Sequence, residues 1–200
     1  MRLLFLFAAT VCLTVGTYAA VAPAKKAPDF KLTGADAKTY RLADFAGKTV
    51  VLEWVNFGCP FVRKHYDSKN MQSLQQTYTD SGVVWLSICS SAPGKQGFYE
   101  GDALSAQLKK EGAVPTAYLV DAAGTVGRAY GARTTPHMFV INPEGQIAYA
   151  GGIDDIRSAK ISDVPKATNY VADALKALSS GEAVVQSSAP PYGCSVKYAD

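Results

Sequence analysis

The feature that most constrains the fold is an apolar stretch at residues 49–55, which runs through a Gly58-Cys59-Pro60 turn into a helical pattern. The stretch is too apolar to be a strand with one face in water, so it predicts a central strand of a parallel sheet. The turn that follows places one thiol, that of Cys59, in the first turn of a helix.

The rest of the chain supplies strands and helices in alternation. Strands are expected at residues 29–32, 39–42, 49–55, 83–88 and 117–120, and helices at residues 60–78, 102–111 and 126–130. A hairpin of residues 137–141 and 146–150 and a last helix at residues 166–179 follow. This order gives parallel strands first and an antiparallel pair last, with helices on both faces. The predicted fold is therefore α/β and thioredoxin-like, a single domain with a central mixed sheet flanked by helices.

The two ends of the chain are expected to lie outside this domain. Residues 1–19 combine Arg2, an apolar run and a small-residue pattern, which predicts a signal peptide, with an uncleaved anchor as the alternative. Residues 20–27 are predicted to be a flexible linker and residues 28–181 the domain. Residues 182–200 are predicted to be a flexible tail that carries Cys194. We thus expect an exported protein, periplasmic or extracellular, with no membrane attachment after cleavage.

Charge excludes one class of partner. The formal net charge of +3 falls to +2 without residues 1–19, which contain Arg2 and no acid. The sequence has no basic stripe with interleaved aromatic residues, so nucleic-acid binding is not expected.

Three cysteines remain once residues 1–19 are set aside: Cys59, Cys89 and Cys194. Thiols tend to pair outside the cytosol, and three leave one over. At the start of a helix, unpaired N–H groups and the positive end of the dipole favour thiolate over thiol. Cys59 is therefore a candidate nucleophile or redox centre, although a small buried core residue is the alternative.

Four segments of the chain resemble known redox proteins. Residues 42–52, followed by Cys59-Pro60, resemble the redoxins of the alkyl hydroperoxide reductase/thiol-specific antioxidant group. Residues 59–66, 134–140 and 191–197 together resemble the peroxiredoxin-like thioredoxin-family proteins. The resemblance implies a thiol oxidoreductase that acts on a peroxide or a disulfide and is recycled by an external thiol reductant such as a thioredoxin-type protein. It also implies that Pro136 is a cis-proline whose loop faces Cys59, and it implies no cofactor.

The chain departs from these relatives at three positions. Val62 stands where a thioredoxin has the second cysteine of Cys-x-x-Cys. Leu52 and Asn56 stand seven and three residues before Cys59, where a typical peroxiredoxin has Pro and Thr. Asn56 can donate and accept hydrogen bonds, so it is a candidate for orienting a peroxide.

Three charged residues are candidates to support the thiol. Arg63, one turn beyond Cys59, is either a source of positive field or a surface cation. Arg133, three residues before Pro136, is a candidate for a direct role. Glu53 lies on an otherwise apolar strand, at the spacing where thioredoxins carry a buried acid for proton transfer. An acid paired with a lysine at the strand end is the alternative.

Two cysteines compete for the role of resolving thiol. Cys194 matches the family motif and lies on the predicted mobile tail. Cys89 ends the strand at residues 83–88, at the same edge of a parallel sheet as Cys59. We expect Cys194 to resolve, with Cys89 or no partner at all as alternatives.

A competing hypothesis is binding without turnover, by a copper-delivery or cytochrome-biogenesis accessory domain or by a scaffold with a structural disulfide. Four side chains could form a soft-metal site like that of thioredoxin-fold copper chaperones: Cys59, His65, Cys89 and His137. Those chaperones usually present a Cys-x-x-x-Cys pair, which this chain lacks. Asp154-Asp155 is expected to form a turn and a cap, without a catalytic role.

Overall fold

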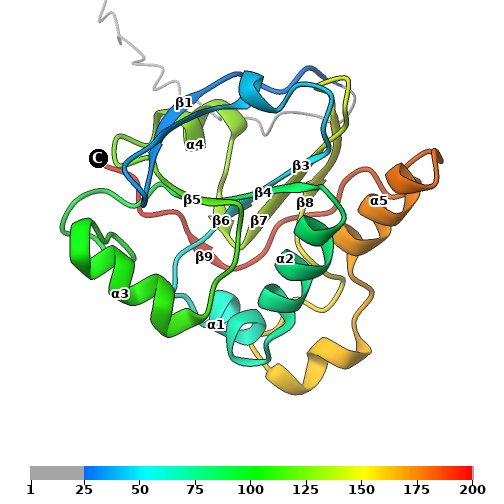
Figure 1. Ribbon diagram of the computed structural model, residues 1–200. Helices are drawn as coiled ribbons and strands as arrows, with labels where there is room; N and C mark the ends of the chain where they lie inside the picture. Colours follow the sequence, from blue (N-terminus) through cyan, green and yellow to red (C-terminus); the bar gives the residue numbers. More distant parts are fainter. Residues whose placement is uncertain (1–24, 200) are drawn as a thin grey trace, which may run out of the picture.

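The computed structural model describes residues 25–199 (Figure 1). The predicted signal peptide at residues 1–19, and residues 20–24 of the predicted linker, lie outside this range. Within it, one mixed sheet has the strand order β2-β1-β5-β4-β3-β7-β8. Its strands are β1 (Lys31–Gly34), β2 (Thr39–Arg41), β3 (Val50–Trp54), β4 (Val84–Cys89), β5 (Ala117–Val120), β7 (His137–Ile141) and β8 (Ile147–Gly151). A separate pair consists of β6 (Thr134–Thr135) and β9 (Cys194–Ser195).

Strand β3 is the centre of the sheet, as its apolar sequence predicts. It pairs in parallel with β4 and antiparallel with β7, and all five of its residues are buried. Side chains alternate along the strand, so Val51 and Glu53 face one side while Leu52 and Trp54 face the other. The strand ends at Trp54, five residues before Cys59, and thereby delivers the thiol to the carboxyl edge of the sheet.

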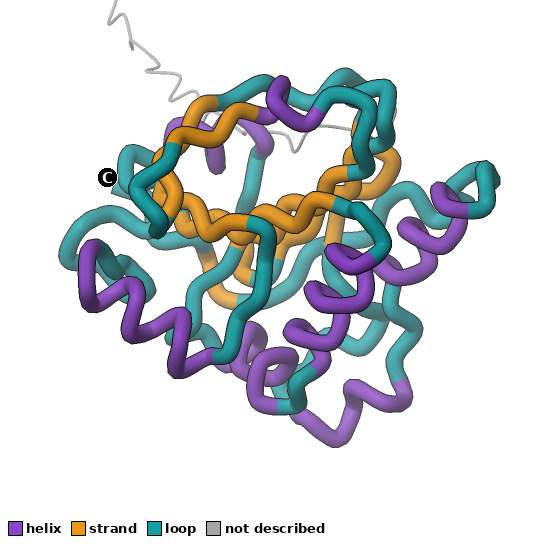
Figure 2. Tube along the Cα trace, in the orientation of Figure 1, coloured by secondary structure: helices purple, strands orange, loops and turns teal. Residues whose placement is uncertain are grey.

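Helices cover both faces of the sheet. The helices are α1 (Pro60–Asp67), α2 (Asn70–Asp80), α3 (Gly101–Glu111), α4 (Thr125–Tyr130) and α5 (Tyr170–Ser179), with 3-10 helices η1 (Leu42–Phe45) and η2 (Ile161–Lys166). Helices α1, α2, α3 and α5 lie on one side and α4 on the other (Figures 1 and 2). The core is accordingly divided in two, with Val62, Met71 and Val171 on the first face and Val126 and Tyr130 on the second. The predicted α/β architecture is confirmed.

Two helix predictions are wrong in their extent. The helix predicted over residues 60–78 is two helices, because α1 ends at Asp67 and Lys69 takes a left-handed conformation with φ of 63°. The Ser68 hydroxyl donates to the His65 carbonyl and accepts from the Asn70 N–H, and such side-chain bonds compete with the helical ladder. The last helix begins at Tyr170 rather than at residue 166, since Asn169 caps it by accepting from the Ala172 N–H.

Both ends of the described chain are bonded to the domain. The Lys25 carbonyl accepts from Ile147, and the Ala27 N–H donates to Gly145. The tail crosses the molecule (red in Figure 1), where Lys197 O accepts from the Ala92 N–H and Lys95 Nζ donates to Tyr198 O. The last part of the tail is thus hydrogen-bonded to the domain, and the flexibility expected of the tail stays a prediction. Among residues 25–199, no helix is both long and apolar enough to cross a membrane.

Candidate functional site

Cys59 is the N-cap residue of α1, and Pro60 occupies the first helical position, which suits proline because its missing N–H would have no partner there. The Cys59 carbonyl accepts from the N–H groups of Val62 and Arg63, which begins the helix. The neighbouring Gly58 and Pro60 are exposed, whereas the Cys59 side chain is 0 % exposed. The thiol therefore lies just beneath the surface, under its own loop and the tail.

Two segments distant in sequence contact the Cys59 thiol. Its Sγ donates to the Thr135 carbonyl at 3.1 Å and accepts from the Cys194 N–H at 3.4 Å. Thr135 and Cys194 are themselves partners in the β6–β9 pair. The Thr135–Pro136 peptide bond is cis, as the resemblance implies. The structure thus brings Cys59, Thr135 and Cys194 together.

The two neighbouring thiols differ in acidity. Burial raises the pKa of Cys59, but hydrogen bonds from the Cys194 thiol, the Cys194 N–H and the Val62 N–H outweigh it and hold the pKa below its ordinary value. Burial and the neighbouring Cys59 raise the pKa of Cys194 to about 11, with Lys197 opposing. Cys59 is thus the more acidic of the two thiols.

Cys89 has different neighbours. It ends β4, is buried, and donates from Sγ to the Gly97 carbonyl at 3.3 Å. Its thiol also helps raise the pKa of the Tyr118 hydroxyl, after burial, which places the two groups side by side. Cys194 rather than Cys89 is therefore hydrogen-bonded to Cys59. None of these three cysteines forms a disulfide in this structure.

Glu53 is fully buried on the face of the sheet that α1 and α2 cover. Its carboxylate accepts from the Tyr66 hydroxyl, Gln75 Nε2, Trp85 Nε1 and Ser87 Oγ at 2.8–3.0 Å. Its partners are therefore neutral, and the alternative of a lysine partner is wrong. Burial raises the pKa of Glu53, while these hydrogen bonds oppose the rise.

Asn56 shapes the loop that carries the thiol. Its Oδ1 accepts from the Gly58 N–H at 2.9 Å, and its Nδ2 donates to the backbone and side chain of Gln96 at 3.2 and 3.3 Å. A Cβ at Gly97, where φ is +88°, would come within 2.4 Å of Asn56 Oδ1, so only glycine permits this approach. Both the oxygen and the nitrogen of the Asn56 side chain are thus hydrogen-bonded within the chain, and its candidacy for orienting a peroxide stays a prediction.

Arg63 and Arg133, the two arginines considered as support for the Cys59 thiol, have contacts of different kinds. The Arg63 guanidinium forms ion pairs with Asp67 and Glu111. Its charge is thus paired on α1 and α3, and the hydrogen bonds that lower the pKa of Cys59 come from other groups. The Arg133 N–H donates to His137 Nδ1 and its carbonyl accepts from the Val196 N–H, and its charge helps to lower the pKa of His137.

The predicted soft-metal group does not assemble. His137 packs against Phe139 at 4.6 Å, and burial, with the charge of Arg133, lowers its pKa to about 3. His65 Nδ1 faces Asn70 at 2.9 Å, and burial lowers its pKa to about 4. Across residues 25–199, no group of three or more His, Cys, Asp or Glu side chains could hold a metal ion.

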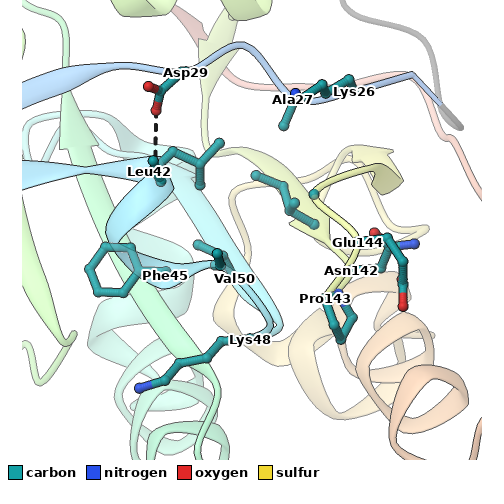
Figure 3. Close-up of a pocket in the computed structure, with 14 residues that line it drawn as sticks. Lys26, Ala27, Asp29, Leu42, Phe45, Lys48, Val50, Asn142, Pro143 and Glu144 are labelled. Carbon is teal, nitrogen blue, oxygen red and sulfur yellow. Dashed lines mark hydrogen bonds between the residues drawn. The ribbon is translucent and has the colours of Figure 1, made fainter.

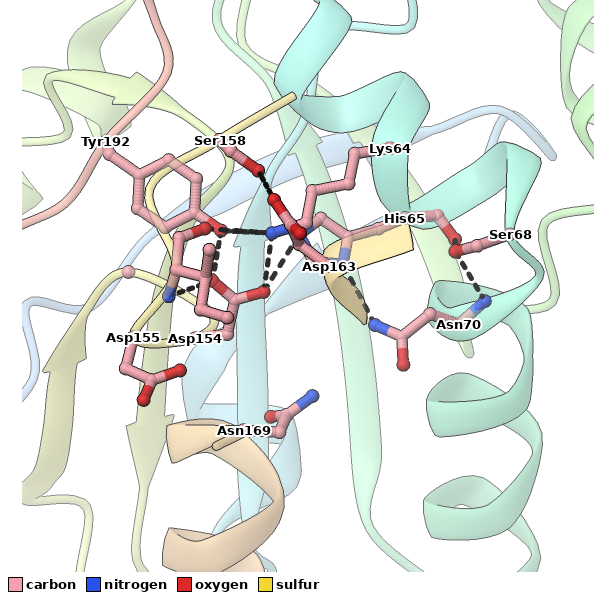
Figure 4. A network of polar contacts seen from close by, with 12 residues as sticks. Lys64, His65, Ser68, Asn70, Asp154, Asp155, Ser158, Asp163, Asn169 and Tyr192 are labelled. Carbon is pink, nitrogen blue, oxygen red and sulfur yellow. Dashed lines mark hydrogen bonds and ion pairs between the residues drawn. The ribbon is translucent and has the colours of Figure 1, made fainter. Parts of the chain in front are cut away.

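The sequence interpretation missed a buried polar cluster beside the tail (Figure 4). Lys64 Nζ donates to Asp154 Oδ2 and the Ile156 carbonyl, both at 2.9 Å, and lies 3.4 Å from the Tyr192 hydroxyl. The Tyr192 hydroxyl donates to Asp154 Oδ1 at 2.5 Å. The predicted turn at Asp154 is present, since Oδ1 also accepts from the Ile156 N–H. The prediction did not include the contacts of Asp154 with Lys64 and Tyr192. The one available signal was that Tyr192 lies beside Cys194 in the family motif.

A pocket of about 310 Å³ lies at the opposite end of β3 (Figure 3). Phe45, Lys48, Val50 and Pro143 are among its lining residues. Val50 begins β3, whereas Cys59 follows the end of that strand. The pocket is lined by no cysteine or histidine and belongs to a different part of the molecule.

A thiol of lowered pKa, beside a second thiol of raised pKa and on this α/β frame, is the arrangement of a redox protein with a thioredoxin-like fold. Residues 23–150 match the model of the AhpC/TSA family, and the chain belongs to that family. The match ends before Cys194, so the tail lies outside it. A search of curated proteins finds no match.

Solved structures extend the similarity over most of the chain. A hypothetical protein of Sinorhizobium meliloti 1021 is 25% identical with a TM-score of 0.72, covering 90% of this chain and 97% of that one. An uncharacterized conserved protein of Geobacillus kaustophilus is 26% identical with a TM-score of 0.74, covering 88% and 92%. A putative thiol:disulfide interchange protein DsbE of Chlorobium tepidum is 26% identical with a TM-score of 0.52, covering 64% and 83%. The AhpC/TSA match and the structure titled as a thiol:disulfide interchange protein indicate a thiol oxidoreductase family.

Proposed function

We propose that the protein is an exported thiol peroxidase in which Cys59 is the nucleophile and Cys194 the resolving thiol. The observation that carries the proposal is the contact between the two residues, in which the Cys194 N–H lies 3.4 Å from Cys59 Sγ. The opposite pKa shifts of the two thiols match the two roles. Export rests on the pattern of residues 1–19.

The chemistry has two steps. The Cys59 thiolate attacks the nearer oxygen of a hydroperoxide, the O–O bond breaks, and the leaving oxygen takes a proton to become water or an alcohol. The Cys194 thiol then attacks the sulfur of the Cys59 sulfenic acid, which forms the Cys59–Cys194 disulfide and releases water. An external dithiol of the thioredoxin type returns both thiols by exchange and becomes a disulfide itself. The complete burial of Cys59 favours a small oxidant over a bulky one.

Disulfide exchange is a second candidate. In it, the Cys59 thiolate displaces one thiol of a substrate disulfide, and Cys194 then displaces the other. Two observations favour it: both ends of the Asn56 amide already bond within the chain, and the chain resembles a structure titled as a thiol:disulfide interchange protein. The non-catalytic copper hypothesis finds no comparable geometry among residues 25–199.

Purified protein lacking residues 1–19 tests these roles. With hydrogen peroxide and a dithiol reductant, Cys59→Ser should abolish peroxide consumption, because it removes the thiol whose pKa is lowered and which lies beside Cys194. Cys194→Ala should stop turnover at a Cys59 sulfenic acid, trapped by dimedone and located by mass spectrometry. Cys89→Ala, the matched control, should keep wild-type turnover.

Three results would contradict the proposal. One is peroxide consumption that persists in Cys59→Ser. Another is an oxidised protein in which Cys89 and Cys194 are paired and Cys59 is free. A third is the absence of turnover together with stoichiometric Cu(I) uptake that His137→Ala removes, which would support the copper hypothesis. Reduction of a protein disulfide without peroxide consumption would instead support the second candidate.

A further inference from the structure

Tyr192 occupies a buried socket on the domain (Figure 4). The Lys64 and Asp154 side chains that form the socket are 0 % and 3 % exposed. The Tyr192 hydroxyl joins them, and its ring meets the Phe61 ring edge-on at 5.9 Å. A tail residue is thus held by both a polar and an aromatic contact.

Lys64 of the socket belongs to the same helix as the nucleophile. Cys59 caps α1, and Phe61 and Lys64 lie within its first two turns. On the tail, Tyr192 precedes Cys194 by two residues. Helix α1 therefore fixes the distance between Lys64, where Tyr192 docks, and the sulfur of Cys59. Two residues of the tail then lead from Tyr192 to Cys194.

Gly193, between Tyr192 and Cys194, lets the tail pass close to the β6 segment. Its φ is +133°, and an added Cβ would lie 2.1 Å from the Thr135 carbonyl oxygen. The tail therefore passes closer to the β6 segment than any other residue type would allow.

The socket loses bonds when the tail leaves. Without Tyr192, Asp154 loses the hydroxyl that donates to Oδ1, while the buried Lys64–Asp154 pair remains. Asp154 Oδ1 then keeps only the Ile156 N–H, and Lys64 loses its contact with the hydroxyl, so the hydrogen bonds of Tyr192 favour the docked tail. Docking raises the effective concentration of Cys194 at Cys59, which is what closure of a disulfide requires.

We infer that Tyr192 is a positioning residue, with Lys64 and Asp154 as its socket, that docks the tail so that Cys194 closes the disulfide on Cys59. The inference rests on the proposed roles of Cys59 and Cys194. It concerns how the two thiols are brought together and is independent of which oxidant reacts first.

Glutathione redox buffers test this docking without a physiological substrate. Oxidised glutathione takes the two thiols to the Cys59–Cys194 disulfide and becomes two reduced glutathiones, so the equilibrium constant measures effective thiol concentration. Tyr192→Phe keeps the ring on Phe61 and removes only the hydroxyl. We expect the equilibrium constant to fall about tenfold, the size of one hydrogen bond to a charged partner.

Tyr198→Phe is the matched control. Its hydroxyl also tethers the tail, by donating to the Ala132 carbonyl at 2.8 Å, but it lies outside the socket. We expect its equilibrium constant to stay within about twofold of the wild type, because Tyr192 still docks. Circular dichroism of both variants verifies that the domain is folded.

The outcomes separate this inference from the proposed function. If the wild type forms no Cys59–Cys194 disulfide at any glutathione ratio, the proposed function is wrong. If the wild type closes it and Tyr192→Phe has the same equilibrium constant, the docking role is wrong. Equal losses in Tyr192→Phe and Tyr198→Phe would also overturn the docking role, because they would show that any loosening of the tail suffices.

Discussion

Two buried carboxylates lie beside helix α1, and their partners are of opposite kinds. Glu53 accepts hydrogen bonds from neutral donors, among them Tyr66 of α1. Asp154 bonds to a cation, Lys64 of the same helix, and to a tyrosine of the tail. A carboxyl among neutral donors can take up a proton without leaving a charge unpaired, whereas the carboxylate of Asp154 has a lysine as its ion-pair partner. The first network is suited to proton exchange and the second to anchoring.

The Glu53 and Asp154 networks also lie in different parts of the molecule. The Glu53 network lies between the sheet and helices α1 and α2, in the interior. The Asp154 network joins three segments far apart in sequence: α1, the loop after β8 and the tail. Loss of the interior network should therefore change protonation, while loss of the second should change stability and tail docking.

The largest effect is expected from Lys64→Met, which leaves Asp154 buried without its cation. We expect the free energy of unfolding to fall by about 3–5 kcal/mol, because an unpaired buried charge is strongly destabilising. Urea unfolding measures it. The control is Lys38→Met, which breaks the exposed pair with Asp36 and should change the free energy of unfolding little, because solvent screens that pair. Equal losses in the two variants would remove the distinction between a buried and a surface ion pair here.

A smaller, pH-dependent effect is expected from Glu53→Gln. Burial raises the pKa of Glu53 above its ordinary 4.5, so the folded protein holds this proton to higher pH than the unfolded chain. The stability from the protonated carboxyl is fully present below 4.5 and is lost as pH rises through the folded pKa. The wild type should therefore lose stability relative to Glu53→Gln as pH rises above 4.5, by at most about 1.4 kcal/mol per pH unit. Urea unfolding over a pH series tests this, and a pH-independent difference would contradict it.

The smallest effect is expected at the thiol itself. Cys194→Ala removes the thiol hydrogen bond that helps lower the pKa of Cys59, so the Cys59 pKa should rise toward its ordinary value. The pH dependence of Cys59 alkylation, read by mass spectrometry, measures it. Cys89→Ala should leave the midpoint unchanged, because the Cys89 thiol bonds to Gly97 instead. A lower midpoint in Cys194→Ala would show that the assigned hydrogen bond is not what stabilises the thiolate.

The local sequence pattern was sufficient to predict the central strand and the start of helix α1. The apolar run at residues 49–55 predicts the covered central strand, and the Gly58-Cys59-Pro60 turn predicts the thiol at a helix start. The break at Lys69 was missed, because it depends on bonds that Ser68 and Asn70 make with one turn of helix. Periodicity continued across that break and concealed it.

The partners of charged residues were less accessible to prediction. Arg63 was considered for the thiol because it lies one turn away, yet Asp67 and Glu111 pair with it. Glu53 was expected to be a buried acid or a lysine's partner, and its neutral donors come from α1, α2 and β4. Spacing along a chain gives the face of an element, but it does not give which side chain of another element reaches that face.

By itself, the sequence determined the α/β frame, the central strand and the position of Cys59 at the start of a helix, because backbone propensity and hydrophobic pattern act over a few residues. Only the tertiary structure decided that Cys194 meets Cys59 across 135 positions and that Tyr192 enters a socket on Lys64, 128 positions away. Such contacts depend on where the sheet and its helices deliver each segment. Burial then makes them strong, since a desolvated charge stabilises the fold only beside a partner.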